Sequence, residues 1–283
     1  MLQHRHRLSA SAADLPCPRQ ASPASPGGGS QGAFGAALSV DLSRRLPLEI
    51  RKGERMCFPL APALRLFYRA GMPVSAKICG LSTPATLDAA VAGGASHVGF
   101  VFFAPSPRNV GLDLAAGLAA RVPAQVRRVG VFVDPDDALL DAAVAAGRLD
   151  SIQLHKTAPE RVAAIRSRLH RDTWAAVAVK TRADLDAARS YAGAADRILY
   201  DAKTPPGAAL PGGMGLRFDW TLLDGFRHPL PWALSGGLDP ANVAEAVART
   251  GAPLVDVSSG VEEAPGVKDP TRIGAFLKAV TRA

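Results

Sequence analysis

The sequence predicts an α/β protein whose fold is a parallel eight-stranded (β/α)8 barrel, a TIM barrel, over residues 72–283. Short β-branched runs alternate with Ala- and Leu-rich helical patterns, and this alternation implies a parallel sheet. Eight such units in about 212 residues match the size of a small closed barrel. No apolar run approaches 18 residues, so the sequence predicts no membrane span.

The strands are expected where β-branched residues cluster between turn residues. In chain order the expected strands are Val74–Cys79, His97–Phe102, Arg128–Val133, Ser151–His155, Trp174–Val179, Arg197–Asp201, Trp232–Ser235 and Leu254–Ser258. An open doubly wound sheet is the alternative. It would need no eighth unit, and it usually begins with a glycine fingerprint that this sequence lacks.

Capping signals mark several helices between these strands. A capping side chain precedes a proline, which suits the first helical position, at Thr83-Pro84, Asp134-Pro135, Asp239-Pro240 and Asp269-Pro270. Glycines that favour helix ends occur at Gly93, Gly147 and Gly251.

The spacing of the strand ends predicts two long loops. Most steps are 22 to 24 residues, but Phe102 to Val133 spans 31 and Asp201 to Ser235 spans 34. The extra residues are expected after strands two and six, at the end of a barrel where active sites lie.

Residues 1–71 are expected to be a disordered N-terminal extension, or to follow from a start codon assigned too early. The run Ser22–Ser30 resembles a linker, and the acid-poor opening also resembles a transit peptide weakly. This segment holds ten Lys and Arg against four Asp and Glu, which leaves 23 against 21 for residues 72–283. The excess positive charge therefore does not predict a nucleic-acid-binding barrel.

The cysteines predict neither a disulfide framework nor a metal site. Cys17, Cys57 and Cys79 follow no such spacing, and the His residues are scattered. We therefore expect a reducing, cytoplasmic location. The oligomeric state is expected to be a monomer or a homodimer.

Cys79 and Asp201 are the candidate acid–base pair. Strand alternation places Cys79 and Lys77 on the inner face of strand one, and Asp201 on the face of Leu199. Each residue type is more often structural, but both end strands at the barrel mouth. A nearby cation such as Lys77 could lower the pKa of the thiol, although Lys77 is equally a candidate core counter-ion. A shielded carboxylic acid could stay protonated.

Other polar groups are expected at the same mouth. Arg108, in the loop after strand two, offers a planar fork for a carboxylate, or it is a solvated loop residue. Glycine turns follow strands six to eight, at Gly212–Gly215, Gly236-Gly237 and Ser259-Gly260. Those after strands seven and eight expose backbone amides where barrels commonly bind phosphate. His155 ends strand four, either as a core histidine or as a supporting group.

Taken together, these segments resemble the phosphoribosylanthranilate isomerases of tryptophan biosynthesis. The resemblance covers residues 74–283 and rests on several motifs: Lys77–Gly80, Ser106–Arg108, Gln153–His155, Leu199–Asp201, Gly212–Gly215, Leu234–Leu238, Asp256–Glu262 and Pro265–Asp269. Met214 and Lys156 depart from it, where a small polar residue and a glycine are usual, and the loop 203–210 is somewhat longer.

The resemblance implies an Amadori rearrangement of N-(5-phosphoribosyl)anthranilate to 1-(2-carboxyphenylamino)-1-deoxyribulose 5-phosphate. It implies Asp201 as the acid, Cys79 as the base and Arg108 as the ligand of the anthranilate carboxylate. The phosphate is expected at Gly213, Gly215, Gly236, Gly237, Ser259 and Gly260. No metal or organic cofactor is implied, because the substrate nitrogen serves as the electron sink.

Two other functions stay open at this point. Another phosphate-binding barrel of tryptophan or histidine biosynthesis is expected to carry Lys and Glu, or paired Asp, at its strand ends. A non-catalytic barrel with a basic tail that binds nucleic acid would have no need to keep Cys79, Arg108 and Asp201 together.

Overall fold

The computed structural model describes residues 73–205, 207–208 and 210–283, and in them eight parallel strands close into a barrel. Each strand pairs with the next, and β8 pairs with β1. The strands are β1 (Ser75–Cys79), β2 (His97–Phe102), β3 (Arg127–Val133), β4 (Ser151–His155), β5 (Asp172–Val179), β6 (Arg197–Ala202), β7 (Trp232–Leu234) and β8 (Leu254–Val257). The predicted fold class is confirmed, whereas the prediction for residues 1–71 lies outside the described residues.

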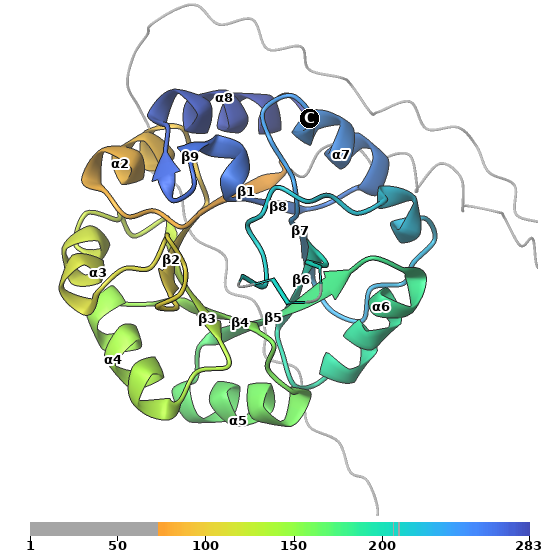
Figure 1. Ribbon diagram of the computed structural model, residues 1–283, viewed down its shortest axis with the longest axis horizontal. Coiled ribbons are helices and arrows are strands. Elements are labelled where there is room, and N and C mark those ends of the chain that lie inside the picture. The colour runs from red at the N-terminus through yellow and green to blue at the C-terminus, as the bar shows by residue number, and fades with distance from the viewer. Residues whose placement is uncertain (1–72, 206, 209) are drawn as a thin grey trace, which may run out of the picture. The chain divides into compact units, whose positions relative to one another are not determined.

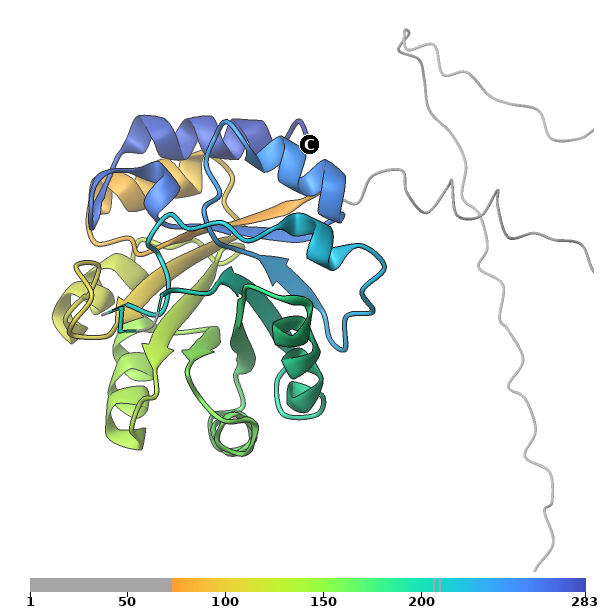
Figure 2. The same ribbon diagram turned by 45° about the vertical axis from the view of Figure 1, so that its right-hand side comes forward.

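Helices surround the strands as an outer ring (Figure 1). They are α2 (Pro84–Ala92), α3 (Leu112–Ala119), α4 (Asp137–Gly147), α5 (Pro159–Leu169), α6 (Arg182–Asp186), α7 (Val243–Thr250) and α8 (Pro270–Val280). The turned view in Figure 2 also shows strands inside and helices outside.

One of the eight units departs from the strand–helix pattern. Between β6 and β7 the described residues form only a 3₁₀ turn, η2 (Trp220–Leu223), in place of an α-helix. In the preceding unit, the short helix α6 continues into a 3₁₀ turn, η1 (Ala187–Tyr191). Most of the segment from Asp201 to Ser235 is a loop, which crosses in front of the strands in Figure 1.

Two helix starts were predicted wrongly. Thr83 and Asp269 cap α2 and α8 as expected. The cap of α4 is Asp136 rather than Asp134, because its carboxylate accepts the Leu139 amide at 2.8 Å. Asp239 instead forms a turn by accepting the amides of residues 241 and 242, so that α7 begins three residues after Pro240. An acidic residue before proline therefore marks a turn as readily as a helix start.

Strand alternation divides the core into two parts. Outward side chains pack against the helices in one large apolar cluster that includes Ile78, Phe100 and Tyr200. Inside the barrel, Trp174 is fully buried in a lower layer with Val129, Leu199, Ala233 and Leu254. An upper layer holds Cys79, Val101 and Val131. The residues that the sequence assigned to the inner face therefore lie beneath the barrel mouth.

A small hairpin follows β8. After the 3₁₀ turn η3 (Ser259–Val261), strands β9 (Glu262–Ala264) and β10 (Val267–Lys268) pair antiparallel and lead into α8. The hairpin packs against the loop after β2, since the Pro107 carbonyl leaves no room for a side chain at Gly266. Among the helices of the described residues, none has the length and apolar character that crossing a membrane requires.

Candidate active site

A cavity opens at the carboxyl ends of the strands. It is lined by most of the residues predicted to act together: Cys79, Arg108, Asp201, Gly213, Gly215, Gly236, Gly237 and Ser259. Gly260 lies behind this lining, packed so closely on the Leu238 carbonyl that a methyl group would overlap it. The long loops after β2 and β6, predicted from strand spacing, supply Arg108 and Gly213.

Cys79 lies at the floor of the cavity above a buried ion pair. Lys77 Nζ donates to Asp256 Oδ1 at 2.9 Å, and both side chains are buried. Burial raises the pKa of the Cys79 thiol, although the Lys77 ammonium acts in the opposite direction. Of the two roles that the sequence left open for Lys77, lowering of the thiol pKa does not prevail, because desolvation of the thiolate outweighs the attraction. Lys77 serves as the counter-ion of Asp256.

Asp201 is a buried carboxyl beside a second carboxylate. Burial, together with repulsion from Asp256, raises the pKa of Asp201 to about 7. Its Oδ1 accepts the Ala202 amide at 2.9 Å. A carboxyl whose pKa is raised toward neutrality can hold a proton at a pH where an ordinary carboxyl is ionised, which suits a general acid.

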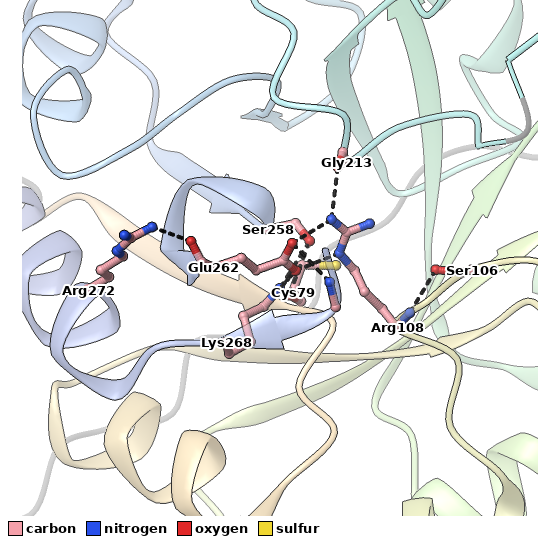
Figure 3. Close-up of polar contacts among 9 residues, drawn as sticks. Cys79, Ser106, Arg108, Gly213, Ser258, Glu262, Lys268 and Arg272 are labelled. Atoms are coloured by element: carbon pink, nitrogen blue, oxygen red, sulfur yellow. Dashed lines mark hydrogen bonds and ion pairs between the residues drawn. The ribbon is translucent and has the colours of Figure 1, made fainter. Parts of the chain in front are cut away.

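The Arg108 guanidinium is held by three hydrogen bonds (Figure 3). Its Nε and Nη2 each donate to a different oxygen of Glu262 at 2.7 Å, and Nη2 also donates to the Gly213 carbonyl at 2.9 Å. Arg108 is 5% exposed, so it is not a solvated loop residue. The planar fork expected to hold a ligand carboxylate is occupied by Glu262, which leaves the N–H groups of Nη1.

The Glu262 side chain also contacts the hairpin that carries it (Figure 3). It accepts hydrogen bonds from Lys268 Nζ and from the Gly266 amide. Lys268 also donates to Ser258 Oγ at 3.4 Å, and Ser258 Oγ donates to the Cys79 carbonyl at 3.4 Å. Glu262 therefore connects the loop after β8 with the loop after β2.

The glycine turns after β6, β7 and β8 meet on one side of the cavity. Gly213, Gly215, Gly236 and Gly237 have positive φ angles of 63° to 90°, a region that side chains disfavour. Gly237 lies against the Gly215 carbonyl, and Gly215 lies near Ser259 Oγ. In the described residues, the amides of Gly213, Gly215, Gly236, Gly237, Ser259 and Gly260 donate no backbone hydrogen bond. Such amides can bind an anion.

His155 also lines the cavity, 9% exposed, and its imidazole is paired with Gln153 at 2.9 Å between the two Nε2 atoms. Burial and the positive charges of Lys77 and Lys156 lower the pKa of His155 to about 4. The imidazole is therefore neutral at ordinary pH.

Sequence reasoning assigned no role to Asp256, Glu262 or Lys268. The alternation that identified Cys79 also predicts an inward side chain at Asp256, two residues after the inward Leu254. Glu262 and Lys268 carried no such signal, because their contacts depend on how the hairpin after β8 packs on a loop some 150 residues earlier in the chain.

Comparisons with known proteins agree on one family. The family model described as N-(5'phosphoribosyl)anthranilate (PRA) isomerase matches residues 76–279. The N-(5'-phosphoribosyl)anthranilate isomerase of Rhodospirillum centenum is 57% identical over 208 residues, 73% of this chain and 97% of the relative. That of Paramagnetospirillum magneticum is 54% identical over 209 residues, 74% of this chain and 97% of the relative.

Solved structures agree with this result. The crystal structure of phosphoribosyl anthranilate isomerase from Thermotoga maritima is 35% identical, with a TM-score of 0.66 over 74% of this chain and 100% of that one. A phosphoribosyl anthranilate isomerase in complex with reduced 1-(o-carboxyphenylamino)-1-deoxyribulose 5-phosphate has a TM-score of 0.65 at 33% identity, with the same coverage. The chain therefore belongs to the N-(5'-phosphoribosyl)anthranilate isomerase family, whose members are isomerases of tryptophan biosynthesis.

Proposed function

We propose that this enzyme converts N-(5-phosphoribosyl)anthranilate to 1-(2-carboxyphenylamino)-1-deoxyribulose 5-phosphate, with Asp201 as general acid and Cys79 as general base. The observation that carries this assignment is the position of a carboxyl with a pKa of about 7 in the same cavity as a buried thiol. A relative binds the reduced form of the proposed product, which supports the choice of ligand.

In the first step, the Asp201 carboxyl gives its proton to the furanose ring oxygen. The bond from that oxygen to C1′ breaks, and the electron pair of the bridging nitrogen forms the iminium. The Cys79 thiolate then takes the proton from C2′, and the resulting enolamine tautomerises to the ketone. The substrate nitrogen accepts the electrons, so the proposal needs no metal or organic cofactor.

The active ionisation state is a minor one under this proposal. Burial raises the pKa of the Cys79 thiol, while the pKa of Asp201 is about 7. Near pH 8 the prevailing singly protonated form therefore has a thiol and a carboxylate, whereas the reaction uses a thiolate and a carboxylic acid. Both forms hold one proton, so their ratio does not change with pH.

The ligand's two anionic ends have separate partners in the proposal. The Nη1 group of Arg108 would donate to the anthranilate carboxylate, because Glu262 occupies the other edge of the guanidinium. The amides of Gly213, Gly215, Gly236, Gly237 and Ser259 would bind the phosphate. Gly260 would contribute its amide while its missing side chain allows the close approach to Leu238.

The test uses the full-length chain and freshly made phosphoribosylanthranilate, whose anthranilate fluorescence is lost on turnover. We expect turnover well above buffer, and a fall in kcat of roughly 10²-fold or more in Asp201→Asn and in Cys79→Ser. Absence of turnover would reject the activity. If both substitutions changed KM alone, the activity would stand and the assigned roles would not.

A further inference from the structure

We infer that His155 is a further substrate-contacting residue, whose Nδ1 exchanges a hydrogen bond with a hydroxyl group of the phosphosugar substrate. This inference rests on the proposed function, because it takes a phosphosugar as the ligand of the cavity. It assigns a role to a residue that the acid–base steps do not use.

The two ring nitrogens of His155 have different surroundings. Nε2 lies 2.9 Å from Gln153 Nε2, and Gln153 is buried. Nδ1 has no hydrogen-bond partner among the described residues. Because it is not a fully buried atom, it retains access to solvent. Since His155 lines the cavity, the accessible nitrogen is the one available to a ligand.

Gln153 holds the ring in one orientation. Because a neutral imidazole has one donor and one acceptor, the Gln153 contact also determines whether Nδ1 donates or accepts. The side-chain oxygen of Gln153, Oε1, has no hydrogen-bond partner within the described part of the chain. A buried amide oxygen without a hydrogen bond lowers the stability of the fold. The Gln153–His155 pair is therefore not explained by its contribution to stability.

The position of His155 specifies the ligand group. His155 and Asp201 line the active-site cavity together, and both also line a second cavity that includes Lys203 and Thr204. Both side chains lie near Gly212, where an added methyl group would come within 3.8 Å of His155 Cε1. A nitrogen in this position faces the sugar that Asp201 protonates, and a neutral imidazole suits a hydroxyl, which can donate or accept.

Two substitutions separate this role from a structural one. The side-chain amide of Asn takes the place of Nδ1, whereas that of Gln takes the place of Nε2. His155→Asn therefore keeps the proposed substrate contact and loses Gln153, and His155→Gln does the reverse. We expect kcat/KM of His155→Gln to be roughly tenfold below that of His155→Asn, the loss of about one hydrogen bond.

Urea unfolding provides the structural readout for the same two variants of the full-length chain. We expect His155→Asn to be the less stable variant and the more active one. Equal kcat/KM for the two, or a higher value for His155→Gln, would overturn the inference. Turnover by the wild-type enzyme under the same conditions verifies the proposed function independently.

A measurement on the wild-type protein decides the matter if His155→Gln does not fold. The ¹⁵N resonances of the His155 ring are recorded with and without reduced 1-(2-carboxyphenylamino)-1-deoxyribulose 5-phosphate. We expect the Nδ1 resonance to move on binding while Nε2 keeps its value. An unchanged Nδ1 in the saturated complex would overturn the inference, whereas failure of the analogue to bind would contradict the proposed function instead.

Discussion

Replacing Asp201 with Asn is expected to stabilise the fold while it removes activity. The folded protein raises the pKa of this carboxyl from 3.8 to about 7, through burial and the nearby Asp256 carboxylate. The ionised form is therefore disfavoured in the folded state, and above pH 7 the wild-type protein bears the full cost of holding it. Asn is uncharged at every pH, and its side-chain oxygen can still accept the Ala202 amide.

The shift sets the size of the effect. About three pKa units at 1.36 kcal/mol each give an upper limit of roughly 4 kcal/mol above pH 7. The wild-type penalty begins as pH rises above 3.8, where the unfolded chain ionises, and it stops growing above about 7. Between pH 5 and pH 8 the advantage of the variant should therefore grow by up to about 3 kcal/mol.

The assay is urea unfolding of the wild-type protein and Asp201→Asn at pH 5 and pH 8, with the free energies of unfolding compared at each pH. Asp113→Asn is the matched control, because it makes the same replacement at an exposed position in α3. The reasoning is refuted if the difference between wild type and Asp201→Asn is the same at both pH values, or shrinks at pH 8.

Three other changes test the rest of the site. We expect kcat/KM to rise with pH through about 7, as the first proton leaves Asp201, and to level off above it; a pH–rate profile that instead falls through pH 7 would contradict the order of the two pKa values. Lys77→Met should lower the free energy of unfolding in urea by roughly 3–5 kcal/mol, because it leaves Asp256 buried and unpaired; a loss under 1 kcal/mol would contradict that role. Gly260→Ala should lower kcat/KM by up to about 10²-fold by forcing the turn away from the Leu238 carbonyl, and unchanged kinetics would show that the turn is not part of the phosphate site.

Local patterns were sufficient to predict the barrel. Each strand was placed to within two residues because β-branched runs and turn residues repeat at nearly constant spacing, and alternation then located Cys79, Lys77 and Asp201 on the inner face. The prediction failed where two local outcomes have similar free energies. At Asp134-Pro135 the helix is capped two residues later by Asp136, and at Asp239-Pro240 the aspartate caps a turn instead, so an Asp-Pro pair alone does not locate the helix start.

The candidate site was predictable in its members but not in their electrostatics. Strand ends indicate which residues meet at the mouth, whereas a pKa depends on how deeply each is buried and on which charge lies beside it. Lys77 illustrates the difference: its position was predicted, but its partner Asp256 comes from a strand 179 residues later. The backbone of the turn after β4 was not predicted either: Lys156 has a φ of 53°, in the left-handed region that favours glycine.

The arrangement around Arg108 suggests why a site built from separate loops can be rigid. Its guanidinium contacts Glu262 from the loop after β8 and Gly213 from the loop after β6, while its own backbone belongs to the loop after β2. These contacts hold the three segments together within the protein. A ligand that had to order the segments on binding would lose affinity through the entropy cost. Under the role proposed for Arg108, the edge of the guanidinium that contacts Glu262 is unavailable to the ligand. Under that proposal, positioning of Arg108 takes precedence over the number of hydrogen bonds it can offer.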